Sequence, residues 1–206
     1  MTDTDAAALR ELVTTSQQRI KALRQAGDLA ALLAAAKRAA DDIERAVGER
    51  KDEAAREALI TVRRFTFNAA ADGWPGWQIS DKAPDTRILM AAQELARRSA
   101  ELNKRLVLGP LQEGTGLWLC GAFDLALGNY GEAAKAFEAA RQKYAEGAAP
   151  GLALLTEGYS AILSQAVGHA DGESLEAVIA KIKAGGFEDG AEWVEQLRTA
   201  LKVFAR

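Results

Sequence analysis

The sequence predicts an all-α fold of about nine helices, and three features of the sequence support this. Apolar residues recur every three or four positions along most of the chain, as on amphipathic helices. Valine and isoleucine, which favour strands, are far outnumbered by alanine and leucine. Glycine and proline separate the periodic segments, as expected of helices joined by short turns.

The first 48 residues predict a helical hairpin. Helices are expected at 4–26 and 28–47, and Asp28 is the expected N-cap of the second. The apolar stripe of the second helix is regular enough to be a packing face, partly between two copies of the chain. A third helix is expected at 50–71.

Residues 49–206 predict a continuous array of further helix pairs. The longest break, 72–85 (DGWPGWQISDKAPD), precedes a helix at 86–106 that Asp85 is expected to cap. A central pair follows at 114–144, and a further pair is expected at 151–167 and 173–183. A last helix at 189–205 is expected to cover the exposed end of the core.

The stretch from Gly114 to Tyr144 carries the most specific pattern. It resembles the tetratricopeptide repeat (TPR), which has a small residue in its first helix, then Gly-x-Tyr and Ala-x-x-x-Phe-x-x-Ala. The matching residues are Gly121, Gly128, Tyr130, Ala133, Phe137 and Ala140. The resemblance covers one repeat at about 114–147; Asp124 replaces the usual tyrosine and the closing proline comes late, at Pro150. It implies a right-handed TPR-like α-solenoid with a concave binding face.

The glycines of the central pair also have a packing interpretation. Gly114, Gly121 and Gly128 recur every seventh residue, nearly two helical turns, so they fall close to one line on the first helix. We expect them to let a neighbouring helix approach closely. A phosphate-binding loop in LGPLQEGTGLW is the weaker alternative, because the Lys-Ser/Thr of a P-loop is absent.

Composition argues against several classes of function. The net charge of -3 gives no basic excess, so no nucleic-acid partner is expected. One cysteine rules out an internal disulfide, and the spacing of the acidic residues offers no calcium loop, so neither a metal nor a cofactor is expected. Neither a signal peptide nor a membrane-spanning segment is expected, which favours the cytoplasm.

Catalytic residues are not expected. His169 is the only histidine and lies in a Gly-His-Ala-Asp-Gly segment without a surrounding motif, so a solvated loop is the expected place for it. Cys120 lies in an apolar helix and is expected to be a small core residue rather than a nucleophile.

Two features are candidates for recognition. Asp124 lies among apolar residues, so it should line a wet groove or meet a cation, with Arg63 and Arg64 as the expected partners. Glu157 is expected to face the same side. The rings of Trp74 and Trp77 either offer a recognition surface or fold inward as a lid on the core.

These observations favour a non-catalytic scaffold or adaptor that binds a protein or peptide on its concave face. The expected contacts are Arg63, Asn68, Trp74, Trp77 and Asp124. The alternative is a small-molecule sensor or enzyme with a pocket under the 72–85 loop. A homodimer formed through the N-terminal hairpin or the last helix is a third option.

Overall fold

The computed structural model describes residues 3–77, 85–168 and 174–204. Within these ranges the chain is all-α, as predicted. It forms nine α-helices and one short 3-10 helix: α1 (Asp3–Ala26), α2 (Leu29–Val47), α3 (Glu53–Asp72), η1 (Pro75–Trp77), α4 (Thr86–Arg105), α5 (Pro110–Ala126), α6 (Tyr130–Glu146), α7 (Pro150–Ala166), α8 (Leu175–Ala184) and α9 (Gly190–Phe204).

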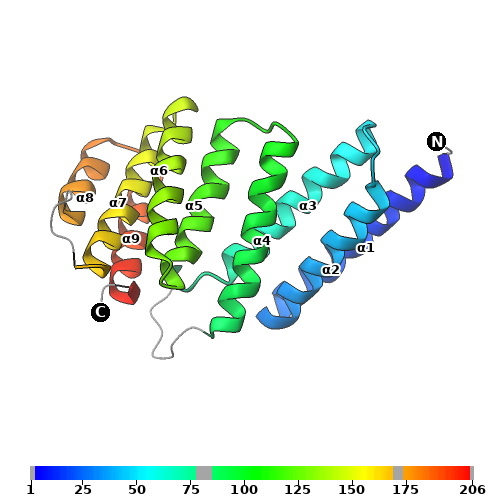
Figure 1. Ribbon diagram of the computed structural model, residues 1–206, viewed down its shortest axis with the longest axis horizontal. Coiled ribbons are helices and arrows are strands. Elements are labelled where there is room, and N and C mark those ends of the chain that lie inside the picture. Colours follow the sequence, from blue (N-terminus) through cyan, green and yellow to red (C-terminus); the bar gives the residue numbers. More distant parts are fainter. Residues whose placement is uncertain (1–2, 78–84, 169–173, 205–206) are drawn as a thin grey trace.

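The helices form an elongated array of antiparallel pairs. Each α-helix packs against the next one in the chain, and the two termini lie at opposite ends of the array (Figure 1). Contacts of α1 with α3 and of α2 with α4 join the N-terminal hairpin to the following pair. This packing is consistent with a helical-repeat-like array.

Aspartate side chains start three of the helices. Asp28 accepts a hydrogen bond from Ala31 N at 3.0 Å, and Asp85 accepts one from Arg87 N at 2.8 Å, so both predicted caps are confirmed. The prediction that the third helix starts at residue 50 is wrong. It starts at Glu53, because Asp52 caps it by accepting from Ala55 N at 3.1 Å.

The central pair also begins earlier than predicted. Its first helix, α5, starts at Pro110 rather than Gly114, so much of the glycine-rich stretch is helical. Proline is well suited to the first turn, because the missing N–H has no acceptor there in any helix. Helix α7 also starts at a proline, Pro150, forty residues after Pro110. This spacing is longer than the 34 residues that a TPR spans.

The predicted role of the glycines in close packing is confirmed for Gly114 and Gly121 but is wrong for Gly128, which lies beyond the end of α5 with nothing within 4 Å of a Cβ. A Cβ on Gly114 would lie 2.9 Å from the Tyr144 ring, and one on Gly121 would lie 2.8 Å from the Phe137 ring, both on α6. Gly158 has a corresponding position on α7. A Cβ on Gly158 would lie 2.6 Å from Leu197, which belongs to α9 rather than to α8.

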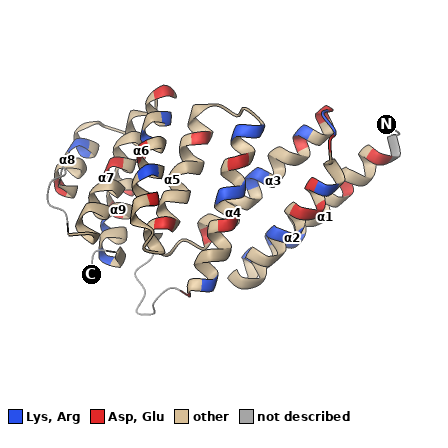
Figure 2. Ribbon diagram, in the orientation of Figure 1, with Lys and Arg blue, Asp and Glu red and all other residues tan. Residues whose placement is uncertain are grey.

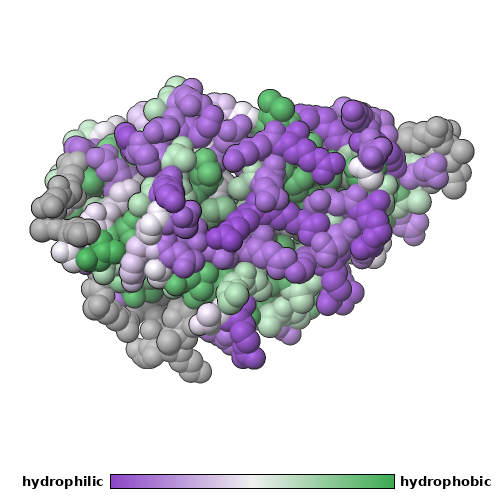
Figure 3. Space-filling view, in the orientation of Figure 1, coloured by the Kyte–Doolittle hydropathy of each residue, from purple (hydrophilic) through white to green (hydrophobic). Residues whose placement is uncertain are grey.

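The apolar stripe of α2 is buried within the chain. Its buried residues are Leu32, Leu33, Ala35, Ala36, Ala39, Ala40, Ile43 and Val47. Outside it, ion pairs join α2 to α4: Arg98 contacts Asp41 at 2.6 Å and Glu44 at 2.7 Å. Charged residues of both signs line these helices, and the face over them is mostly hydrophilic (Figures 2 and 3).

A search of the described helices for a segment long and apolar enough to cross a bilayer found none.

Candidate functional site

The two loop tryptophans lie in different environments. Trp74 is 2% exposed, whereas Trp77 in η1 is 42% exposed. The Trp74 ring folds back beneath Gly76, where a Cβ would lie 2.0 Å from it, so the turn needs glycine at this position. Trp74 therefore packs inward, as one of the two alternatives expected of both rings, whereas Trp77 stays at the surface.

Trp74 is the centre of an aromatic cluster built from four separate segments. Its ring centroid lies 5.0 Å from Trp77, 5.9 Å from Trp118 of α5, 5.5 Å from Tyr159 of α7 and 5.9 Å from Phe204 of α9. Through these contacts η1 packs against α9, more than a hundred residues away in sequence. No pattern in the sequence indicates that these rings meet, because no helical period relates them.

Two donors inside the aromatic cluster have no acceptor among the described residues. They are the indole N–H groups of Trp74 and Trp118, both buried. By contrast, Trp77 Nε1 donates to the Ala71 carbonyl at 2.6 Å, which fixes the exposed ring against the last turn of α3. A buried donor without an acceptor costs about 1–3 kcal/mol.

Arg63 lies half-buried on α3, where neutral groups hold it. Its Nε donates to Asn103 Oδ1 of α4 at 2.6 Å, and Asn103 Nδ2 donates to the Gln112 carbonyl of α5 at 2.6 Å. The guanidinium carbon lies 5.4 Å from the centroid of the Phe67 ring, one turn along α3. Burial lowers the pKa of Arg63. Within the described part of the chain, no carboxylate pairs with it.

We call five residues the α3–η1 surface: Arg63, Phe67, Asn68, Ala71 and Trp77. Arg63, Phe67 and Ala71 are spaced four residues apart and so share one face of α3. Asn68 is exposed and follows the half-buried Phe67 in sequence. Trp77 lies at the end of this surface, where its Nε1 donates a hydrogen bond to the Ala71 carbonyl. This surface includes three of the five predicted contact residues, Arg63, Asn68 and Trp77. Trp74 lies inside the protein, and Asp124 lies on α5 facing α4.

Asp124 is 4% exposed and has three side-chain donors. Its Oδ1 accepts from Gln93 Nε2 at 2.7 Å, from an Arg97 nitrogen at 3.2 Å and from Asn129 Nδ2 at 3.3 Å. The predicted pairing with Arg63 or Arg64 is wrong, because Asp124 faces α4 rather than α3. Gln93 and Arg97 are four residues apart on α4, and that spacing was the signal available in the sequence.

The remaining reactive or charged candidates are Cys120, Glu157 and His169. Burial, with a smaller effect from Asp124, raises the pKa of Cys120 to about 12, so its thiol is protonated at neutral pH. Glu157 lies 3.7 Å from Lys181 of α8. His169 lies outside the described residues. In the parts of the chain that the structure describes, no group of three or more His, Cys, Asp or Glu side chains could hold a metal ion.

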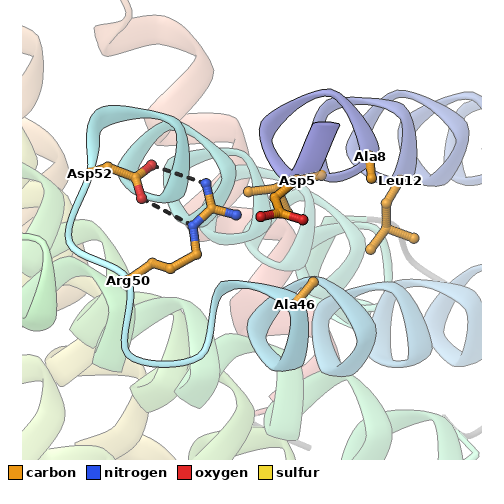
Figure 4. Close-up of a pocket in the computed structure, with 7 residues that line it drawn as sticks. Asp5, Ala8, Leu12, Ala46, Arg50 and Asp52 are labelled. Carbon is orange, nitrogen blue, oxygen red and sulfur yellow. Dashed lines mark hydrogen bonds and ion pairs between the residues drawn. The ribbon is translucent and has the colours of Figure 1, made fainter. Parts of the chain in front are cut away.

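A hollow of about 530 Å³ lies between the start of α1, the end of α2 and the turn before α3 (Figure 4). Asp5, Ala8, Leu9, Leu12, Ala46, Arg50 and Asp52 line it. Arg50 binds Asp52 through two hydrogen bonds, of 3.0 and 3.1 Å, and its guanidinium lies between Asp52 and Asp5 in Figure 4. A second hollow of about 850 Å³ shares Arg50 and Asp52. None of the five predicted contact residues lines either hollow.

Comparisons of the chain with protein-family models, with curated proteins and with solved structures found no match.

Proposed function

We propose that this protein is a non-catalytic, TPR-like scaffold or adaptor that binds a protein or peptide through the α3–η1 surface. Stacked helix pairs present long surfaces of this kind to partner chains. The partner would contact Arg63, Asn68 and Trp77, while Trp74 supports Trp77 from below. Asp124 would act indirectly, by holding α5 against α4 through Gln93 and Arg97.

One observation carries this proposal: Trp77 is 42% exposed at the edge of an aromatic cluster whose rings at Trp74, Trp118 and Tyr159 are buried. Its indole N–H is fixed by the Ala71 carbonyl, so binding a partner costs little side-chain entropy there. Fixed tryptophans dominate the binding energy of many interfaces. The neighbouring Phe67, Arg63 and Asn68 extend this contact along α3.

The test compares Trp77→Ala with Tyr130→Ala, a control with similar exposure (42% against 40%) on α6. Partners retained by the full-length protein from its own host would be identified by native mass spectrometry, and their affinity measured with each variant. We expect Trp77→Ala to weaken binding by about 2 kcal/mol, roughly thirtyfold, and Tyr130→Ala to leave it unchanged. Equal affinities for both variants would contradict the proposal.

A second candidate is a small-molecule sensor or enzyme with its site beneath the loop after α3. The buried indole N–H groups of Trp74 and Trp118 favour it, because a ligand with hydrogen-bond acceptors would satisfy them. Native mass spectrometry of gently purified protein distinguishes the two functions. A retained small molecule, lost in Trp118→Phe, would favour the sensor over the adaptor.

A further inference from the structure

Arg63 differs from the other partly buried arginines in what it binds. Arg98 contacts two carboxylates, Asp41 and Glu44, and Arg50 contacts Asp52. Among the described residues, Arg63 instead has the neutral Asn103 oxygen on its Nε and the Phe67 ring nearby. Moving a cation out of water without a counter-charge is unfavourable, and burial lowers the Arg63 pKa for this reason.

The contacts of Arg63 orient it without using most of its donors. A guanidinium group has five N–H donors in a rigid fork. In Arg63 the Nε–H group donates to Asn103 Oδ1. Asn103 is fully buried, and its own amide group donates to the Gln112 carbonyl, so its oxygen is held in position. In the described ranges no hydrogen bond involves the terminal nitrogens of Arg63.

We infer that Arg63 receives a carboxylate from the partner, so that the bound segment carries Asp or Glu next to an apolar residue. This inference rests on the proposed adaptor function. A carboxylate matches the guanidinium fork with two parallel hydrogen bonds, and partial burial strengthens such a pair. The apolar neighbour of the carboxylate would lie on Phe67, towards Trp77, along the α3–η1 surface.

The test begins with a displayed library of random twelve-residue peptides, selected on the full-length protein. The best peptide and its Asp→Asn or Glu→Gln version would then be titrated by calorimetry against three proteins. These are the wild type, Arg63→Gln and Arg64→Gln. Arg64 is exposed on the next position of α3, so its variant has the same net charge as Arg63→Gln and controls for long-range electrostatics.

We expect the selected peptides to be enriched in Asp or Glu beside an apolar residue. Arg63→Gln should bind the acidic peptide at least about tenfold more weakly, and Arg64→Gln should change its affinity less than about threefold. The neutral peptide should bind the wild type and Arg63→Gln equally. Thermal unfolding of each variant would show that it is folded.

Three outcomes would overturn the inference. Peptides that bind Arg63→Gln as well as the wild type would support the adaptor but exclude a carboxylate at Arg63. If millimolar inorganic phosphate displaces the peptide from the wild type but has no effect on Arg63→Gln, the site would be assigned to phosphate instead. If no peptide is enriched, the proposed function itself fails, and this inference with it.

Discussion

Buried polar side chains set the position of several helices in this protein. Asn103 is fully buried and joins three helices, because it accepts from Arg63 of α3 and donates to the Gln112 carbonyl of α5. Asp124 joins α5 to α4 in a similar way. Hydrogen bonds of this kind are directional, so they specify which helix faces meet, whereas apolar burial mainly requires that they meet.

At the residue scale, Asp52 gives stability that depends on pH. The hydrogen bond from Arg50, followed by the one from Ala55 N, lowers the pKa of Asp52 below its ordinary value of 3.8. This contribution is fully present above the unfolded-state pKa and is lost as the pH falls through the lower folded-state pKa. Asp52→Asn keeps a side chain that caps the helix but removes the charge.

We therefore expect the difference in unfolding free energy between the wild type and Asp52→Asn to be largest near neutral pH. It should shrink towards zero below about pH 4 as Asp52 is protonated. Urea denaturation of both proteins between about pH 3 and pH 7 measures this difference. A difference that stays constant across the range would contradict an electrostatic origin.

At the scale of helices, glycines determine how closely α5 approaches α6. In Gly121→Ala the new methyl group would meet the Phe137 ring at 2.8 Å, so the helices must separate or Phe137 must leave its rotamer. We expect the unfolding free energy to fall by about 1–3 kcal/mol, even though alanine is the better helix former.

The matched control is Gly131→Ala, in the first turn of α6, where a Cβ meets nothing within 4 Å. There the higher helix propensity of alanine acts alone, so we expect a gain of up to about 1 kcal/mol. Chemical denaturation of the two variants gives both values. Two changes of the same sign would show that close packing does not explain Gly121.

At the scale of the whole molecule, the contact of η1 with α9 departs from a simple repeat array. In such arrays each unit contacts only its neighbours, so the ends can unfold separately. Here Trp74 follows α3, yet its ring meets Tyr159 of α7 and Phe204 of α9. This contact connects the middle of the array to its C-terminal end and should make unfolding more cooperative.

Trp74→Ala tests this coupling. Removing a ring that is 2% exposed should lower the unfolding free energy by about 3–5 kcal/mol. Hydrogen exchange in α9 should then become faster than in α2. In the wild type we expect the amides of both helices to lose protection in the same unfolding event. Trp77→Ala is the control, because its half-exposed ring should cost about 1 kcal/mol or less. Equal exchange rates in α9 and α2 of Trp74→Ala would show that the Trp74 ring does not couple the two ends.

Local patterns in the sequence determined the helices, most of their limits and the places where two helices approach closely. Helical periodicity and capping depend on residues a few positions apart, as at Asp28 and Asp85, so they can be read from the chain directly. The glycines of α5 were identified for the same reason.

Only the tertiary structure decided which partners distant residues meet. It paired Asp124 with Gln93 and Arg97, left Arg63 without a described carboxylate, and separated the two loop tryptophans into one buried and one exposed ring. These contacts join segments far apart in sequence, and their geometry depends on how whole helices rotate and pack. No spacing of residues within one helix specifies that rotation.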